Sequence, residues 1–352
     1  MHSKDISEFR PARILVCQLR QIGDVLLATP SIRLLSERFP EAEIHVLTEK
    51  KCVPVLENNP RVHRVWPIDR KALANPFKAL AYYASVGRQG FDLIVDFQQL
   101  PRCKWVILFS KAPVRLSFPP RWYNRTLYTH SSPVVYGYAA KCKASVLVPL
   151  GIEWNGERPE LWLTGEERQF AESFMDAHGL TGQPFITVDP SHRRETRRWP
   201  ARHFAGLIRL LRETHPELGA VILHGPGERE LADEVAALAG EGAFSTETML
   251  SLREMAAVQE RAVLHLGNCS APRHFAVAVD TPSLTIQGAT GTGWGFPSEE
   301  HISATQRLAC YPCNKNTCKT RECLENFLPA DILDEALRLI AVGREKTSTA
   351  AD

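Results

Sequence analysis

The feature of this sequence that most constrains its fold is the alternation of short, continuous apolar runs with longer segments of helical spacing. Residues 14–17 are all apolar, and apolar residues recur at helical spacing through 25–39. Such short apolar runs are typical of strands buried on both faces of a parallel sheet. Further expected elements are a helix at 72–86 and strands at 43–47, 62–67 and 93–97. The first half therefore predicts parallel βαβ units with helices on both faces of the sheet.

The same alternation restarts in the second half of the chain. Its expected strands are 185–188, 220–223, 262–266 and 283–286, and its expected helices are 166–178, 201–214 and 228–239. A chain of 352 residues also exceeds what one hydrophobic core usually supports. We therefore expect an α/β protein of two Rossmann-like domains, residues 1–164 and 165–328. A C-terminal helix and tail, 329–352, follows, and we expect 345–352 to be frayed.

The charge balance excludes one large class of function. The chain has 42 basic and 40 acidic residues and a net charge of +2, which gives no reason to expect nucleic-acid binding over the whole surface, so any basic site must be local. Residues 1–11 are polar and lack the apolar stretch of a signal peptide. No segment approaches the roughly 20 apolar residues that a membrane-spanning helix needs. These features predict a cytoplasmic protein, which leaves contact with a membrane surface open.

The first loop with chemical potential follows the first strand and contains Gly23 and Asp24. Gly23 permits a tight strand-to-helix turn, and Asp24 stands where a helix begins. Asp is a favoured N-cap, and its carboxylate suits the positive end of the helix dipole. The same side chain can instead act as a general base that takes a proton from an acceptor hydroxyl. Spacing alone favours the cap, and the two roles coexist only in part, because a carboxylate pinned by amides is a weaker base.

Three loops of the second half carry candidate ligands for a phosphate-bearing substrate. Residues 189–198 include four arginines and lead into Trp199 and Pro200. A basic loop can neutralise a diphosphate leaving group, although a merely solvated loop is the alternative. Residues 225–228, Gly-Pro-Gly-Glu, follow another strand and are weak evidence alone. Residues 266–276 join a strand to a helix and contain Ser270 and His274, where amides and a hydroxyl suit a phosphate. His274 alone is better explained as a capping or core histidine.

Four of the nine cysteines lie within fourteen residues near the C-terminus, at Cys310, Cys313, Cys318 and Cys323. Thiolates at such spacing can ligate zinc or an iron–sulfur cluster. The segment has neither two Cys-x2-Cys halves nor a ferredoxin spacing, so free thiols or a local disulfide are favoured over a metal site. Lys315, Lys319 and Arg321 in the same segment can face an anionic acceptor.

Residues 13–48, RILVCQLRQIGDVLLATPSIRLLSERFPEAEIHVLT, resemble the opening of the bacterial ADP-heptose:lipopolysaccharide heptosyltransferases, glycosyltransferase family 9. The resemblance extends more loosely to about Pro329. It implies the GT-B architecture, in which two Rossmann-like domains face each other, the first binding the acceptor and the second the nucleotide sugar. It also implies inversion of configuration at the transferred sugar.

The resemblance assigns roles to single residues. Asp24 matches the proposed catalytic base, which reverses the preference for a simple cap. Arg197 matches a basic residue, often Lys, that stands two positions before Trp-Pro and contacts the donor phosphates. Ser270 and His274 match a phosphate-binding pair. Glu228 matches an acidic residue near the donor ribose or base.

Two positions depart from the family pattern Asp-Ser/Thr-Gly-x-x-His. Cys269 stands in place of the Asp and Ala271 in place of the Gly. The first departure removes a charge that the family is thought to use on hydroxyls of the donor sugar. It leaves the donor sugar open, and it supports a rival interpretation in which the chain binds nucleotide sugars without turnover. A UDP-amino-sugar epimerase, also of GT-B type, is the least favoured alternative because its motif order is missing.

The combined expectation is an inverting, cofactor-independent and metal-independent glycosyltransferase. The expected donor is a nucleotide-diphosphate sugar, with ADP-heptose favoured, and the acceptor is a lipid-linked saccharide such as the lipopolysaccharide core. This acceptor implies peripheral contact with the inner face of the inner membrane. Cations of the first domain that can bind acceptor phosphates or the membrane, or can be ordinary solvated charges, are Lys50, Lys51, Arg121 and Arg125.

Overall fold

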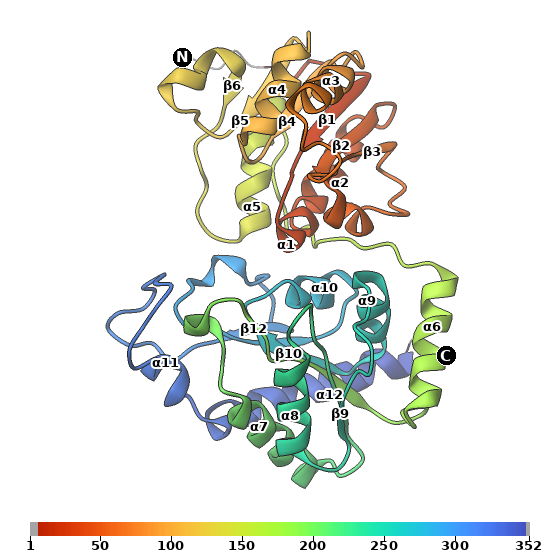
Figure 1. Ribbon diagram of the computed structural model, residues 1–352, viewed down its shortest axis with the longest axis vertical. Helices are drawn as coiled ribbons and strands as arrows, with labels where there is room; N and C mark the ends of the chain where they lie inside the picture. The colour runs from red at the N-terminus through yellow and green to blue at the C-terminus, as the bar shows by residue number, and fades with distance from the viewer. Residues whose placement is uncertain (1–5, 350–352) are drawn as a thin grey trace. The chain divides into compact units, whose positions relative to one another are not determined.

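The computed structural model describes residues 6–349 and divides into two compact units whose boundary lies between Trp162 and Leu163. Each unit contains one six-stranded sheet in which every strand pair is parallel (Figure 1). Helices cover both faces of each sheet, as continuous apolar strands require. The predicted α/β fold class is confirmed.

The sheet of the first unit has the strand order β3-β2-β1-β4-β5-β6. Its strands are β1 Arg13–Cys17, β2 Glu43–Glu49, β3 Arg64–Ile68, β4 Leu93–Asp96, β5 Val114–Ser117 and β6 His130–Ser131. Its helices are α1 Ile22–Leu26, α2 Thr29–Arg38, α3 Pro76–Gly87, α4 Pro101–Phe109 and α5 Ala139–Ala144, with the 3-10 turns η1 Lys50–Val55, η2 Trp122–Leu127 and η3 Ser145–Leu150.

The second unit repeats this order as β12-β11-β10-β7-β8-β9. Its strands are β7 Phe185–Asp189, β8 Gly219–Ile222, β9 Ala243–Ser245, β10 Leu264–Asn268, β11 Ser283–Ile286 and β12 His301–Ala304. Its helices are α6 Gly165–Ala177, α7 Ala201–Thr214, α8 Arg229–Ala239, α9 Leu252–Arg261, α10 Pro272–Ala278, α11 Glu322–Glu325 and α12 Leu333–Thr349, with the 3-10 turns η4 Glu195–Arg197, η5 Thr292–Trp294 and η6 Pro329–Ile332.

Both sheets have the doubly wound order in which the chain reverses direction beside its first strand. The reversal lies between β1 and β4 in the first unit and between β7 and β10 in the second. Ligands of open α/β sheets bind at the carboxyl ends of the strands on either side of this switch point. The residues that follow β1, β4, β7 and β10 are therefore the ones to examine for function.

Three predicted helices or tails differ in the structure. The expected helix at 25–39 is divided into α1 and α2, because Pro30 stands in the first turn of α2 and has no amide hydrogen to continue α1. The expected helix at 72–86 begins only at Pro76, where Asn75 caps it by accepting bonds from two backbone amides at 2.9 and 3.2 Å. The expected frayed tail is wrong up to Thr349, since α12 continues that far. Residues 350–352 lie outside the described part of the chain.

The cores explain why these elements are stable. In the second unit Trp199 is fully buried and donates its indole N–H to the carbonyl of Phe327 at 2.8 Å. Leu339 and Ile340 of α12 are fully buried in the same core, so α12 belongs to the packing of this unit. Over the described residues, no helix has both the length and the apolar composition needed to cross a membrane.

Candidate active site

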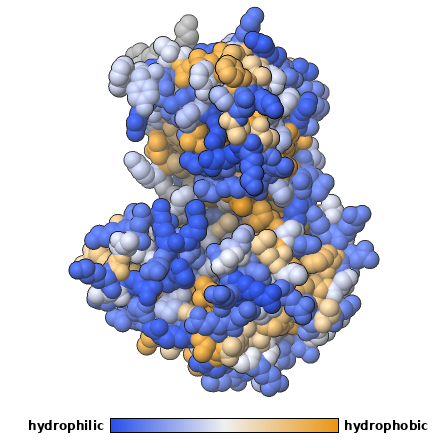
Figure 2. Space-filling view, in the orientation of Figure 1, coloured by the Kyte–Doolittle hydropathy of each residue, from blue (hydrophilic) through white to orange (hydrophobic). Residues whose placement is uncertain are grey.

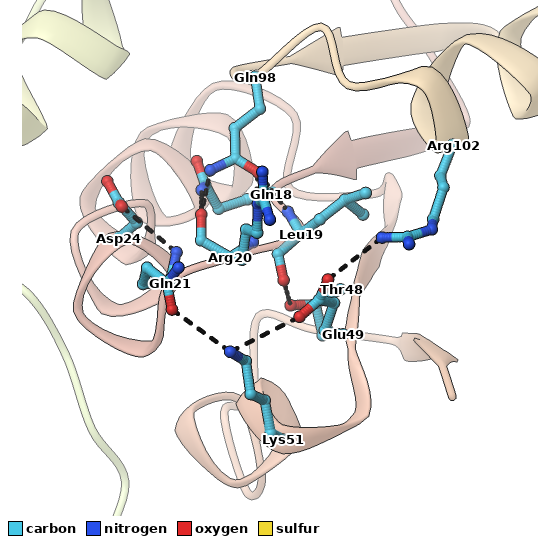
Figure 3. Close-up of polar contacts among 10 residues, drawn as sticks. All are labelled: Gln18, Leu19, Arg20, Gln21, Asp24, Thr48, Glu49, Lys51, Gln98 and Arg102. Atoms are coloured by element: carbon cyan, nitrogen blue, oxygen red, sulfur yellow. Dashed lines mark hydrogen bonds and ion pairs between the residues drawn. The ribbon is translucent and has the colours of Figure 1, made fainter. Parts of the chain in front are cut away.

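Asp24 stands in α1, immediately beyond the carboxyl end of β1. Its Oδ2 atom accepts a hydrogen bond from the backbone amide of Gln21 at 3.3 Å (Figure 3). Gln21, not Asp24, is the residue before the first helical turn, so Asp24 closes that turn from its third position. Its side chain is 24% exposed. The carboxylate thus has a capping contact and an accessible edge at the switch point, which is where a reacting hydroxyl can approach.

Lys143 is a candidate site residue at this place that sequence reasoning missed. Its ammonium group, on α5, lies 3.2 Å from Oδ1 of Asp24 and 3.0 Å from Oε1 of Gln18. The Lys143 side chain is 9% exposed, so this ion pair is screened less than a surface pair. Nothing in the sequence around residue 143 marks it, because 119 residues separate it from Asp24.

The loop that carries Asp24 is braced by side chains from β1 and from the end of β4. Gln98 accepts hydrogen bonds from the backbone amides of Leu19 and Arg20 at 3.0 and 3.2 Å and donates back to the Arg20 carbonyl (Figure 3). Gln18 donates to the same carbonyl at 2.9 Å. Gly23, expected at a tight turn, is a buried residue of α1 whose φ is not in the left-handed region. The turn itself therefore lies at Arg20 and Gln21, before Gly23.

A hollow of about 370 Å³ opens in the first unit beside Gln98. Its lining contains two cations and no acid: Phe97, Gln98, Gln99, Lys104, Phe118, Pro119, Arg121, Tyr123 and Asn124. The predicted cation Arg121 is therefore at a pocket, where it donates to the hydroxyl of Tyr123 at 3.3 Å. Lys50 and Lys51 are different, since they lie 3.0 Å from Asp69 and 3.7 Å from Glu49. Arg125 is exposed.

In the second unit, Asp189 is the last residue of β7 and is only 3% exposed. It accepts hydrogen bonds from the hydroxyls of Ser191, at 3.0 Å, and Ser270. Burial raises its pKa to about 6, and the nearby Glu228 contributes to the rise against the hydrogen bonds, which lower it. Asp189 received no role from the sequence, although an Asp that ends a buried strand was a usable signal. The predicted phosphate ligand Ser270 therefore faces a carboxyl that titrates near neutral pH.

Glu228 precedes α8 and closes the loop in which it lies. Its Oε2 atom accepts from the Gly225 amide at 3.0 Å and lies 2.6 Å from the Ser191 hydroxyl, whose one proton is shared between this carboxylate and Asp189. A side chain at Gly225 would meet this carboxylate at 2.7 Å, so Glu228 would have to move away to make room for it. Glu228 and Asp189 thus share one serine, and the predicted donor loop is joined to the end of β7.

Arg197 is a partly buried cation in η4. Its Nε atom is buried with no hydrogen-bond partner. Burial and the neighbouring Arg194 lower the pKa of its guanidinium, and the thiols of Cys269 and Cys313 oppose that effect. An underused cation of this kind fits a phosphate, which arginine binds through two parallel hydrogen bonds.

Asn268, at the end of β10, holds the Arg197 loop to the sheet. Its side-chain oxygen accepts from the Trp199 amide at 2.9 Å, and its amide nitrogen donates to the carbonyls of Pro190 and Ser191 at 2.8 and 3.3 Å. The side chain is fully buried. Both ends of the loop at 190–199 are therefore fixed by one residue.

The remaining predicted site residues, His274, Cys269 and Ala271, follow β10. His274 is 5% exposed in α10, with its ring centroid 6.5 Å from that of Trp294. Cys269 lies 3.6 Å from Nη1 of the buried Arg273. Ala271 has φ −64°, a conformation that any residue adopts, so the departure from glycine needs no backbone change.

The four-cysteine segment contacts the Arg197 loop, since the Thr196 hydroxyl donates to the Lys315 carbonyl at 2.8 Å. Burial raises the pKa of the Cys323 thiol, with a contribution from the other three thiols, so the four are near one another. No three of these sulfurs lie mutually within 4.8 Å, whereas Zn–S bonds of about 2.3 Å hold thiolates about 4 Å apart. Arg321 pairs with Glu325 at 2.7 Å. The geometry as it stands is that of separate thiols.

Two doubly wound units, with a carboxylate after the first strand of one and a cationic loop after the first strand of the other, are the features expected of a GT-B glycosyltransferase. The sequence model of glycosyltransferase family 9 (heptosyltransferase) matches residues 80–324. The chain belongs to this family, and it is a glycosyltransferase. The family predicted from residues 13–48 is thereby confirmed.

Curated and solved relatives agree with this assignment. Lipopolysaccharide heptosyltransferase 3 of Escherichia coli is 27% identical over 290 residues, 77% of this chain and 82% of that protein. A glycosyltransferase family 9 structure from Veillonella parvula has a TM-score of 0.81 at 21% identity and covers 94% of this chain and 97% of that one. E. coli heptosyltransferase WaaC with ADP-2-deoxy-2-fluoro heptose has a TM-score of 0.67 at 18% identity, with 91% and 99% covered. At these identities the two structures establish the fold.

The raised pKa of Asp189 predicts a pH dependence of stability. A carboxyl titrates near pH 3.9 in an unfolded chain and here at about 6, so the folded protein binds the extra proton between these values. Its contribution to the free energy of unfolding therefore falls as the pH rises from about 4 to about 6, and is level above. The Asp189→Asn variant has no carboxyl group at this position, so this contribution does not change with pH. We measure the free energy of unfolding of both proteins in urea. The value for the variant minus the value for wild type should rise by on the order of 2–3 kcal/mol between pH 4 and pH 7.

The comparison needs only the difference between the two proteins, because all other titrating groups are common to both. A difference that stays constant over this pH range would mean that folding does not raise the pKa of Asp189.

Proposed function

We propose that this protein is an inverting glycosyltransferase that moves heptose from ADP-heptose to a lipid-linked saccharide of the lipopolysaccharide core. The observation that carries the proposal is the Asp24 carboxylate, positioned at the end of β1 by Gln21 and Lys143 in a family 9 glycosyltransferase. WaaC, a structural neighbour, is described with ADP and with an ADP-heptose analogue, which supports the choice of donor.

The proposed reaction is a single displacement. The oxygen of an acceptor hydroxyl forms a bond to the anomeric carbon while the bond from that carbon to the nucleotide diphosphate breaks. The hydroxyl proton passes to Asp24, and the diphosphate leaves with the bonding electrons. Lys143 is a positioning residue here, since its contacts fix the Asp24 carboxylate and do not require contact with substrate.

The second unit would bind the donor through its phosphates. Arg197 supplies a cation with unused hydrogen-bonding capacity, and Ser270 supplies a hydroxyl. In the free protein that hydroxyl is donated to Asp189, so phosphate binding requires it to turn. A protonated Asp189, which its pKa of about 6 makes accessible, can then donate to the Ser270 oxygen and free the Ser270 proton for phosphate.

The first unit would bind the acceptor. Its hollow of about 370 Å³ has Lys104 and Arg121 in its lining and no carboxylate. This lining suits phosphate or carboxylate groups of an anionic saccharide. A lipid-linked acceptor also implies that the enzyme works at the inner face of the inner membrane.

The Asp24→Asn variant tests the base. We expect it to fold and bind ADP normally but to lower turnover by at least about a hundredfold, because Asn cannot take the proton. Turnover is measured as ADP release that depends on acceptor. Asp69→Asn is the matched control, since Asp69 also caps its own loop, at 2.9 and 3.2 Å, and pairs with a lysine. Near-normal turnover in Asp24→Asn would reduce this side chain to a helix cap.

Chelation tests the absence of a metal from the chemistry. We expect full activity in excess EDTA, because Arg197 and hydrogen-bond donors meet the charge of the departing diphosphate. Loss of activity that magnesium or manganese restores would overturn this mechanism. Chelation that instead lowers the thermal stability of the second unit would assign a metal to the four-cysteine segment.

The last test concerns Cys269. A thiol accepts hydrogen bonds only weakly, so a sugar that relies on a carboxylate there loses on the order of 1–3 kcal/mol. We expect ADP to bind normally and ADP-heptose to add little affinity beyond ADP. Cys269→Asp, with Arg273 3.6 Å from the present sulfur to orient the new carboxylate, should improve binding of ADP-heptose. Cys269→Ser is the neutral control, and calorimetry is the measurement.

If the unmodified protein already binds ADP-heptose far more tightly than ADP, Cys269 is not a change of specificity. If no nucleotide sugar turns over in any variant, the rival function, nucleotide-sugar binding without catalysis, is favoured instead.

A further inference from the structure

The first unit contains a long stretch without acidic residues. No Asp or Glu occurs in the 56 residues between Asp96 and Glu153, which include eight lysines and arginines. The remaining 296 residues carry 34 basic and 40 acidic residues. Although the net charge of the whole chain is near zero, this segment is strongly cationic. It spans α4, β5, η2 and α5.

Not all of this charge is available to a partner. Arg115 points inward and donates to the carbonyls of Leu127 and Ala112 at 2.7 and 2.5 Å. Lys143 pairs with Asp24. Lys111, Arg121 and Arg125 are exposed, and no ion pair with a carboxylate is found for them in the part of the chain that the structure describes.

Large apolar side chains are exposed among these cations. Trp105 and Leu108 of α4 are 45% and 57% exposed, and Trp122 and Tyr123 of η2 are 79% and 53% exposed. Lys104 links the two elements, because its ammonium lies 5.9 Å from the centre of the Tyr123 ring. We call Lys104, Trp105, Leu108, Arg121, Trp122 and Tyr123 the basic-aromatic face.

Figure 2 shows an apolar patch over α3 and α4 with hydrophilic residues around it. Phe77 and Leu80 of α3, which packs against α4, extend the exposed apolar surface at 82% and 39% exposure. A contiguous apolar patch on a water-soluble surface marks a binding site for a protein or a membrane. The composition of the basic-aromatic face decides between these two partners.

Surfaces that combine tryptophan and tyrosine with lysine or arginine, and that lack acidic residues, bind at the boundary between lipid headgroups and acyl chains. The aromatic rings lie at the level of the headgroups, and lysine and arginine are attracted to anionic lipids. A protein partner would have to present an acidic patch to these cations. The exposed tryptophans and tyrosine among the cations favour an anionic lipid surface instead.

We propose that the basic-aromatic face docks on the anionic surface of a lipid bilayer. Lys104, Arg121 and Tyr123 belong both to this face and to the lining of the 370 Å³ hollow. Docking thus brings the hollow to the level of the headgroups, where the saccharide of a lipid-linked acceptor is found. This last step rests on the proposed function, whereas docking itself does not.

The test is co-sedimentation of the purified full chain with vesicles. We expect binding to vesicles of phosphatidylcholine mixed with phosphatidylglycerol, and little binding to phosphatidylcholine alone. Neutralising Arg121 and Arg125, as Arg121→Gln with Arg125→Gln, should weaken binding about fivefold for each charge. Raising the salt concentration should weaken wild type more than this variant.

The apolar contribution is tested by replacing two exposed apolar side chains of the basic-aromatic face, with an exposed leucine elsewhere as the control. Leu108→Ser combined with Trp122→Ser should weaken binding to the mixed vesicles by on the order of tenfold or more, because both side chains leave the bilayer boundary. Leu238→Ser is the control, since Leu238 is also a surface leucine, 43% exposed, on α8 of the second unit. Thermal unfolding should be unchanged in all three proteins.

Two outcomes would overturn the proposal. One is equal binding of wild type and the Leu108→Ser/Trp122→Ser variant to the mixed vesicles, or no binding by either. The other is a wild-type dimer in sedimentation velocity that the same substitutions convert to a monomer, which would assign the face to a second copy of the chain. Vesicle binding that follows the predicted pattern in a protein without sugar transfer would leave docking standing while the proposed function fails.

Discussion

The candidate donor site of the second unit depends on one buried amide, that of Asn268. Through four atoms of a single side chain, β10 is joined to Pro190 at one end of the arginine loop and to Trp199 at the other. An aspartate or leucine there would leave buried backbone groups unpaired, each at about 1–3 kcal/mol. Because Trp199 is fully buried in the hydrophobic core next to α7, this end of the loop is anchored in the core of the unit. Arg197 lies in this loop, so its partly buried guanidinium is attached to an anchored backbone.

In the first unit, hydrogen bonds and an ion pair hold the Asp24 carboxylate in place. Asp24 lies in a helix of only five residues, which packing alone would position poorly. The contacts of Gln98 with Leu19 and Arg20 fix the backbone before it, and Lys143 fixes the carboxylate itself. Residues from three separated parts of the chain thus converge on the switch point, which is why their joint role is visible only in the folded molecule.

The sequence was sufficient for the fold class, the family and the strands next to each switch point, because continuous apolar runs and the Gly23-Asp24 loop are local signals. Short edge strands such as β6 and β9 escaped prediction, since two or three residues carry no periodicity. Lys143 and Asp189 escaped for another reason. An ordinary lysine acquires a role only from what folding places beside it, and a pKa of about 6 arises from burial, which composition does not record. Arg321 shows the reverse case, a cation that looked free in the sequence and has a carboxylate partner in the fold.

The hydrogen bonds of Asp189 have a consequence for which molecules can occupy the donor site. The hydroxyls of Ser270 and Ser191 already donate to carboxyl groups, so neither serine is an idle donor for an arriving anion. A small anion such as inorganic phosphate, which must exchange those internal bonds one for one, gains little by entering. A nucleotide sugar can make contacts along its whole length and so outweigh the exchange. These internal hydrogen bonds therefore favour a nucleotide sugar over a small anion at the candidate donor site.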